Sequence, residues 1–250
     1  MSIDGFRTKG PLHRCVVLSS HESVLGFPWE FILVLGAGGK LFPALVKDIF
    51  SIYHLDFLAI LEPKISGIRA DTVIKKIGMV EGARVEAQGF SGGIWCLWKN
   101  SCPPINVISS SKFCINLHIN QNTQNSWYLT IVNASPHMYQ RDEVWEEIKL
   151  FNTTISGPWC VAGDFNQVLF DHKKQGGGPV NSIGRSAFQA CIDSCQLLDM
   201  GFKGQPFTWR RGPSKERLDR VLGNTEWQTL FPNSNITHLQ STPLTIVDFG

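Results

Sequence analysis

The order of its apolar segments is the feature that most limits how this chain can fold. A strand-length apolar run at 31–36 is followed by a helical pattern at 41–54 and a second apolar run at 56–64. The helical pattern places Leu45 and Ile49 on one face, whereas the two flanking runs are short and continuously apolar. Strand, helix and strand in succession predict the first part of a layered α/β arrangement.

The middle of the chain changes to short strands. After a helical stretch near 70–79, strand-like segments are separated by Gly, Pro, Asn or Ser and are typical of an antiparallel meander. These segments are RVEAQGF, GGIWCLWKN, PINVISSS, FCINLHIN and WYLTIVNASP. The next predicted elements are a helix at 141–152, a strand at 158–166, a flexible loop at 173–182 and a helix at 185–201, which Gly201 caps. The closing strands are PFTWRRG, KERLDRVLGN and PLTIVDFG, so we expect two sheets packed face to face with helices outside.

Composition indicates a globular protein. Of 250 residues, 43% are apolar and 18% are charged, and this length is compatible with one large domain. Residues 1–30 show no sustained period, so we expect an irregular lead-in followed by one domain at 31–250. A net charge of +2 gives no strong global field, so nucleic-acid binding would depend on a local basic patch or a metal.

The cysteines and the apolar runs indicate which cellular compartment the protein occupies. The seven cysteines form no CxxC pair and several lie inside apolar runs, which favours buried thiols in a reducing, intracellular compartment. The longest apolar run is far too short to span a bilayer, so we expect no membrane association.

Three carboxylates stand at or near the ends of apolar strands: Glu62, Asp164 and Asp219. Burying a carboxylate at such a place is costly unless it is paired or binds a cation. Several on one rim would suit Mg²⁺ or Mn²⁺, although each alone also fits a solvated strand end. Asp164 and Asn166 are two positions apart, so in an extended segment both side chains share one face. That pair could position a water and hold a phosphate oxygen.

Together the segments LDFLAILEPK, GFSGGIWCLWK, NASPHMYQRDEVWEEI, PWCVAGDFNQVL, LLDMGFKGQPFTWRRG and ERLDRVLGNTEW resemble a known family. The series, over about residues 31–248, is similar to the endonuclease/exonuclease/phosphatase superfamily, especially the apurinic-endonuclease-like domain of plant LINE-type (non-LTR) retrotransposons. The resemblance implies a DNase I-like four-layer α/β sandwich. It also implies Mg²⁺- or Mn²⁺-dependent hydrolysis of DNA phosphodiesters, with a nick that primes reverse transcription. From the same resemblance we expect that the chain binds DNA and that a reverse transcriptase domain is encoded downstream. We also expect a monomer located in the nucleus.

Site roles carry over by the same resemblance. Glu62 matches the metal-binding glutamate, and Asp164 matches the aspartate that orients or activates the attacking water, with Asn166 as its partner. Asp219 matches the aspartate that normally buttresses a catalytic histidine.

Three further residues are expected at the substrate. Arg141 matches an arginine that faces the nucleic acid in the family, and Arg217 lies in the same element as Asp219, where it could contact phosphate. Trp209 fits either the DNA-facing rim or the core. The residues Trp209, Arg210, Arg211, Lys215, Arg217 and Arg220 form either a positive edge for a phosphate backbone or a solvated basic strand pair.

The chain also departs from the family pattern. The first strand lacks the WNCRG-like segment whose Asn helps to place the metal, and Asn133 replaces a tyrosine. The SDH motif that supplies the catalytic histidine is absent between Thr242 and Pro243, and His238 is not expected to replace it. We therefore expect weakened or lost nuclease activity. The alternatives are a catalytically dead module that binds nucleic acid or protein, and a phosphatase of the same fold.

Overall fold

The strands form two large sheets and one small sheet. The computed structural model describes residues 15–20, 29–37, 39–53, 55–79, 81–89 and 91–238. The first sheet has the order β12 (Lys203–Gly204), β16 (Ser234–His238), β1 (Cys15–Ser20), β2 (Trp29–Leu35), β3 (Phe57–Leu61), β5 (Ile94–Trp98) and β4 (Glu81–Val85). The second has the order β11 (Leu198–Asp199), β15 (Asp219–Gly223), β9 (Trp159–Asp164), β8 (Trp127–Asn133), β7 (Cys114–Ile119) and β6 (Ile105–Ser110). The small sheet has the order β10 (Lys174–Gln175), β14 (Ser214–Glu216) and β13 (Trp209–Arg211).

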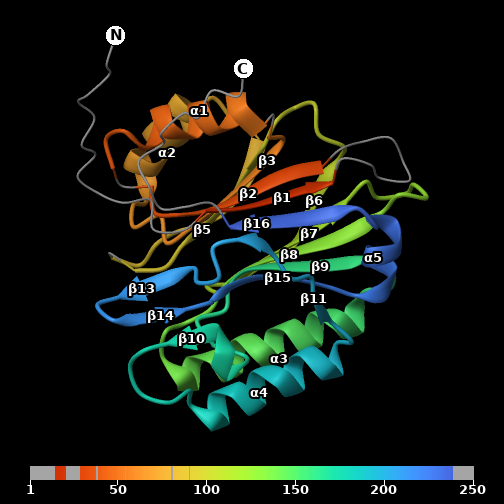
Figure 1. Cartoon of the computed structure of the whole chain (residues 1–250). Coiled ribbons are helices and arrows are strands. Elements are labelled where there is room, and N and C mark those ends of the chain that lie inside the picture. The colour runs from red at the N-terminus through yellow and green to blue at the C-terminus, as the bar shows by residue number, and fades with distance from the viewer. Residues whose placement is uncertain are drawn as a thin grey trace, which may run out of the picture.

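Helices cover the outer faces of both large sheets. The helices are α1 (Phe42–Tyr53), α2 (Gly67–Ile77), α3 (Met138–Thr154), the short η1 (Asp171–Lys173), α4 (Ser182–Ser194) and α5 (Thr225–Leu230). Figure 1 shows α1 and α2 on one side of the stacked sheets and α3 and α4 on the other. The pairs β2–β3 and β8–β9 are parallel and most others are antiparallel. The predicted four-layer sandwich with mixed sheets is confirmed. Within the described ranges, no helix is long and apolar enough to cross a membrane.

The burial of β3 explains why its sequence is continuously apolar. All five of its residues are buried. Phe57, Ala59 and Leu61 belong to the core between the two sheets, whereas Leu58 and Ile60 pack in the core beneath α1 and α2. A strand covered on both faces has no polar side, so the run does not alternate.

One part of the chain differs from expectation, and another cannot be compared with it. β1 lies within the stretch expected to be an irregular lead-in, and it pairs with β2 and with β16. Its six residues are too few to show a period, and one of its two partners lies near the far end of the described chain. The expected strand at 243–250 lies outside the described residues.

The helix predicted at 185–201 is shorter and begins earlier. The Asn181 side chain caps its start by accepting from the backbone N–H of Gly184. It ends at Ser194, and Gln196 then turns the chain with a left-handed φ of 53°. Gly201 also has a positive φ, but it follows β11 and does not cap the helix.

Gly163 permits the close pairing of β8 and β9. It pairs with Val132, and a Cβ added to Gly163 would lie 1.9 Å from the Val132 carbonyl oxygen. Backbone on a buried strand cannot move aside cheaply, so only glycine fits at this position.

We predict that Gly163→Ala lowers the free energy of unfolding by about 2–4 kcal/mol, because the new methyl group clashes with the neighbouring strand. Urea denaturation followed by circular dichroism measures the change. The control is Gly178→Ala, since no atom of the described residues lies within 4 Å of a Cβ there. The control should stay within about 0.5 kcal/mol of the parent. Equal stability of the two variants would contradict the explanation.

Candidate active site

Three buried polar residues form a row across the second sheet. Asn133 ends β8 and pairs with Asp164, which ends β9 and pairs with Asp219 at the start of β15. Their exposed fractions are 5%, 4% and 0%. Ile131 and Ala162, two positions before the first two, lie in the core between the sheets. Side chains two apart share a face, so the row faces the first sheet at the edge of that core.

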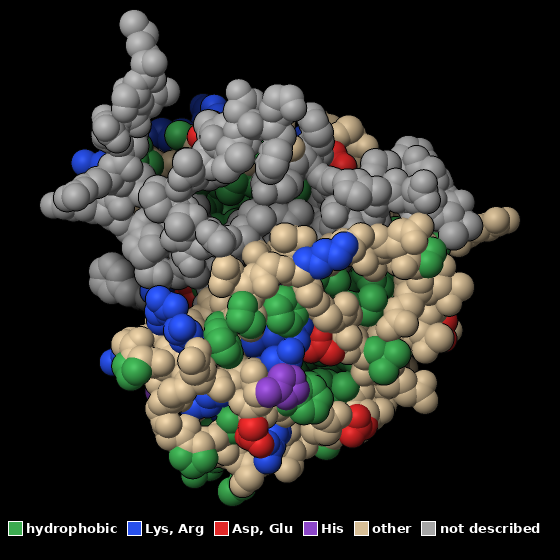
Figure 2. Space-filling view, in the orientation of Figure 1, with side chains coloured by type: hydrophobic (Ala, Val, Ile, Leu, Met, Phe, Trp, Pro, Cys, Tyr) green, Lys and Arg blue, Asp and Glu red, His purple; other side chains and the backbone are tan. Residues whose placement is uncertain are grey.

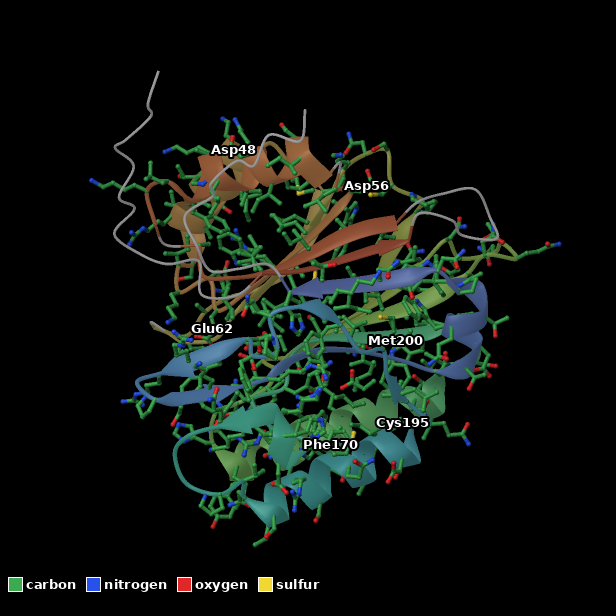
Figure 3. All side chains as sticks on the ribbon, viewed as in Figure 1. Asp48, Asp56, Glu62, Phe170, Cys195 and Met200 are labelled. Carbon is green, nitrogen blue, oxygen red and sulfur yellow. The ribbon has the colours of Figure 1, made fainter. Side chains whose placement is uncertain are left out.

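Glu62 approaches this row from the first sheet. It follows β3 directly, has a left-handed φ of 51° and is half-buried. Its Oε1 accepts from the Gly92 backbone N–H at 3.1 Å and from Asn133 Nδ2 at 3.3 Å. Figure 3 shows Glu62 between the first sheet and the β13–β14 hairpin. The Glu62–Asn133 contact therefore links the ends of β3 and β8 across the two packed sheets, and the sequence alone did not reveal it.

Asn166 is held in a turn rather than in an extended strand. β9 ends at Asp164, whose Oδ1 accepts from the Asn166 backbone N–H at 2.9 Å, and Asn166 has a φ of 47°. The Asn166 Nδ2 donates to the Ala134 carbonyl at 2.7 Å. The expectation that Asp164 and Asn166 share one face of an extended segment is therefore wrong, because the aspartate closes a local turn.

Two buried arginines hold the turn that carries Asn166. Arg141, on α3, donates to the Ser135 and Pro136 carbonyls and to Gln167 Oε1. Arg220 donates to the Gln167 carbonyl at 2.8 Å. Arg141 is 7% exposed and Arg220 is 1% exposed. These contacts give Arg141 a structural role, and they do not favour the predicted role in facing nucleic acid.

Arg217 is also buried, at 2% exposure. Its Nη2 lies 2.7 Å from Asp199 Oδ1, and its guanidinium lies over the Phe202 ring at 4.5 Å. Arg220 Nε lies 3.5 Å from Asp199 Oδ2, and burial first, then Arg217, lowers the pKa of Arg220 to about 10. The predicted positive edge therefore loses both arginines, because they pair with Asp199 inside the protein.

The exposed part of that edge is the β13–β14 hairpin. Arg210 and Arg211 are exposed, and Trp209 and Lys215 are partly exposed. Figure 2 shows basic side chains on the surface where Figure 1 places this hairpin. Trp209 belongs to none of the core clusters of the described residues, so its surroundings favour the rim over the core.

Thr208 joins this hairpin to the row by hydrogen bonds, and this role was not predicted from the sequence. Its hydroxyl oxygen accepts from the backbone N–H groups of Leu218 at 3.0 Å and Asp219 at 3.1 Å. The only sequence signal was its place before Trp209 in PFTWRRG.

The acidic residues do not assemble as a three-carboxylate metal site. In the part of the chain that the structure describes, no three His, Cys, Asp or Glu side chains come together in a way that could hold a metal ion. Glu62 contacts Asn133, which pairs with Asp164, and Asp164 pairs with Asp219, so the three carboxylates lie along one line of neighbouring strand ends. Mg²⁺ is commonly held by one or two carboxylates while it keeps several waters. A site in which Glu62 is the carboxylate ligand and neutral oxygens complete the coordination therefore fits Mg²⁺ better than the expected site shared by several carboxylates.

His238 is a buried neutral histidine at the end of β16. Its ring stacks on Phe202 at 4.4 Å, and its Nδ1 lies 2.8 Å from the Gln205 carbonyl oxygen. A carbonyl only accepts, so Nδ1 carries the proton. Burial lowers the pKa of His238 to about 4; the Gln205 bond and Asp199 raise it, whereas Arg217 and Arg220 lower it further.

One known family matches most of this chain. The description "Endonuclease/Exonuclease/phosphatase family" applies to the family that matches residues 39–241. A search of curated protein sequences finds no match.

Several solved structures share the fold. An AP endonuclease from Leishmania major is 15% identical with a TM-score of 0.56, covering 79% of this chain and 79% of its own. The endonuclease domain of TRAS1, a telomere-specific non-LTR retrotransposon, is 11% identical with a TM-score of 0.56, covering 77% and 84%. A 3′ phosphatase from Neisseria, bound to a product DNA hairpin, is 14% identical with a TM-score of 0.58, covering 77% and 86%. At these identities the likeness shows the fold alone.

We predict that His238 makes the protein less stable in mild acid. Its folded pKa of about 4 lies below the ordinary value of 6.5, so the unfolded chain binds more protons as the pH falls through this window. Between pH 7.5 and pH 5 the parent should lose about 2 kcal/mol more unfolding free energy than His238→Gln.

Urea denaturation at both pH values measures this difference. The matched control is His172→Gln, since His172 is exposed and should leave the parent's pH dependence unchanged. Parallel losses in the parent and in His238→Gln would show that His238 is not buried in its neutral form.

Proposed function

Because the chain belongs to the Endonuclease/Exonuclease/phosphatase family, we propose that it is a divalent-metal-dependent DNA-nicking nuclease domain of a retroelement, with weakened catalysis. The observation that carries the proposal is the row Asn133, Asp164 and Asp219, with the Glu62 carboxylate in contact with Asn133 at its end. The likeness to the endonuclease domain of a non-LTR retrotransposon supports the retroelement origin. The proposal further includes that the retroelement is a plant LINE-type element and that a reverse transcriptase domain is encoded downstream.

In this proposal Glu62, Asp164 and the residues around them have different roles. When bound beside Glu62, a divalent cation supplies positive charge to the scissile phosphate and acidifies a water. Asp164 accepts a hydrogen bond from the attacking water and so orients it. Arg141, Gln167 and Arg220 act on that step only through the backbone turn that holds Asn166. Substrate contact falls to the rim, where Trp209 offers an aromatic face.

The absent SDH motif accounts for the weakening. In the family this motif supplies the catalytic histidine, and the aspartate that Asp219 matches buttresses that histidine. A general acid or base contributes about 10²–10⁴-fold to a rate, so its loss leaves at most a slow enzyme. A binding module without catalysis is therefore the second candidate. A phosphatase is the third, and it is supported by the similar fold of the 3′ phosphatase from Neisseria.

We predict slow, Mg²⁺-dependent nicking of supercoiled plasmid that Asp164→Ala abolishes, because the substitution removes the group that orients water. Agarose gels measure conversion to the open-circle form, with EDTA as the metal-free control. Asp193→Ala is the matched control, since Asp193 is an exposed carboxylate at the end of α4. DNA binding without nicking would favour the binding module. Release of phosphate from a 3′-phosphorylated hairpin without nicking would favour the phosphatase.

We predict that replacing Arg210 and Arg211 together with alanine weakens DNA binding. Each arginine that no longer neutralises a phosphate should reduce the slope of log affinity against log salt by about 1. Fluorescence anisotropy with a labelled duplex at several salt concentrations measures affinity and slope. Lys47→Ala, on the exposed outer face of α1, should change neither quantity. An unchanged salt slope in the double variant would remove the hairpin from the DNA-binding surface.

A further inference from the structure

Asn133 has a buried oxygen that the described part of the protein does not satisfy. Its Nδ2 donates to Glu62 Oε1 and to the Gly93 carbonyl oxygen, each at 3.3 Å. Both partners are oxygens that accept, so these contacts fix which end of the amide is nitrogen. The Oδ1 is then buried without a hydrogen-bond partner among the described residues, and the side chain is 5% exposed. An unsatisfied buried acceptor is costly and indicates a missing partner.

The surroundings of this oxygen indicate what kind of partner it lacks. Its amide contacts the Glu62 carboxylate, and its strand neighbour is Asp164. A neutral amide oxygen beside carboxylates suits a hard divalent cation, which binds through oxygens. Since no three acidic, histidine or cysteine side chains converge among the described residues, neutral oxygens must complete any such site there.

We propose that Asn133 Oδ1 is a ligand, together with Glu62, of one divalent cation of the Mg²⁺ or Mn²⁺ class. The Nδ2 holds the Glu62 carboxylate in place, and the Oδ1 provides a second oxygen for the ion. The proposal rests on the proposed function for the identity of the metal, but it requires no turnover and no DNA. Its rival is a purely structural Asn133 that only fixes Glu62.

The decisive variant is Asn133→Asp. In EDTA the new carboxylate lies against Glu62 and lowers the melting temperature through repulsion between like charges. If Asn133 is a ligand, Mn²⁺ reverses this loss, and the variant binds Mn²⁺ about tenfold more tightly than the parent. Melting curves in EDTA and in millimolar Mn²⁺, with electron paramagnetic resonance of free Mn²⁺, measure both quantities.

The matched control is Asn116→Asp. Asn116 is also a buried strand asparagine, at 2% exposure, but its amide contacts the Ser109 and Thr130 hydroxyls. Its destabilisation should not respond to Mn²⁺. If Asn133→Asp responds no more than this control, the proposal is overturned.

Asn133→Leu and Glu62→Gln separate the ligand from the positioning role. Both should weaken Mn²⁺ binding by about tenfold or more. If Glu62→Gln loses Mn²⁺ while Asn133→Leu keeps the parent affinity, Asn133 is not a ligand and the proposal fails. If the parent itself binds no Mn²⁺, the proposal also fails. Plasmid nicking then decides the proposed function separately, because DNA phosphates can contribute ligands that the free protein lacks.

Discussion

The stacking of the two large sheets is the constraint on which the rest of the structure depends. The core between them takes side chains from β3 and β5 on one side and from β7, β8 and β9 on the other. Because β3, β8 and β9 all end at the same edge of this core, the polar residues that follow their apolar runs meet there. Glu62 and Asn133 touch across the gap between the sheets although 71 positions separate them. The packing that stabilises the two sheets therefore also brings Glu62 and Asn133 into contact.

Much of the fold could be predicted from the sequence because its signals are local. The continuous apolar run of β3 and the amphipathic pattern of α1 each depend on neighbouring residues. Glu62 and Asp164 were recognisable as carboxylates that close such runs. β1 was missed because its six residues are too few to show a period and because one of its two partners pairs Val16 with His238 across almost the whole chain.

The rest of the site depends on contacts that spacing does not show. Arg217 looked like a phosphate ligand, but Asp199, on another strand, pairs with it inside the protein. Asn166 looked extended, but the Asp164 carboxylate folds the next residues into a turn. In both cases a polar partner redirects a side chain, and no periodicity reports which partner it will be. The roles of Glu62, Asp164 and Asp219 themselves stay predictions that the geometry supports.

The anchorage of the β13–β14 hairpin has a consequence for how this domain can diversify. Thr208 fixes the base of the hairpin to the backbone beside Asp219, whereas Arg210 and Arg211, on the strand that begins just after Thr208, are exposed to solvent. Mutations at the exposed end of the hairpin can therefore alter the charge of this surface without moving the buried carboxylates. The exposed residues of the hairpin can therefore change in evolution while the buried row of Asn133, Asp164 and Asp219 is retained.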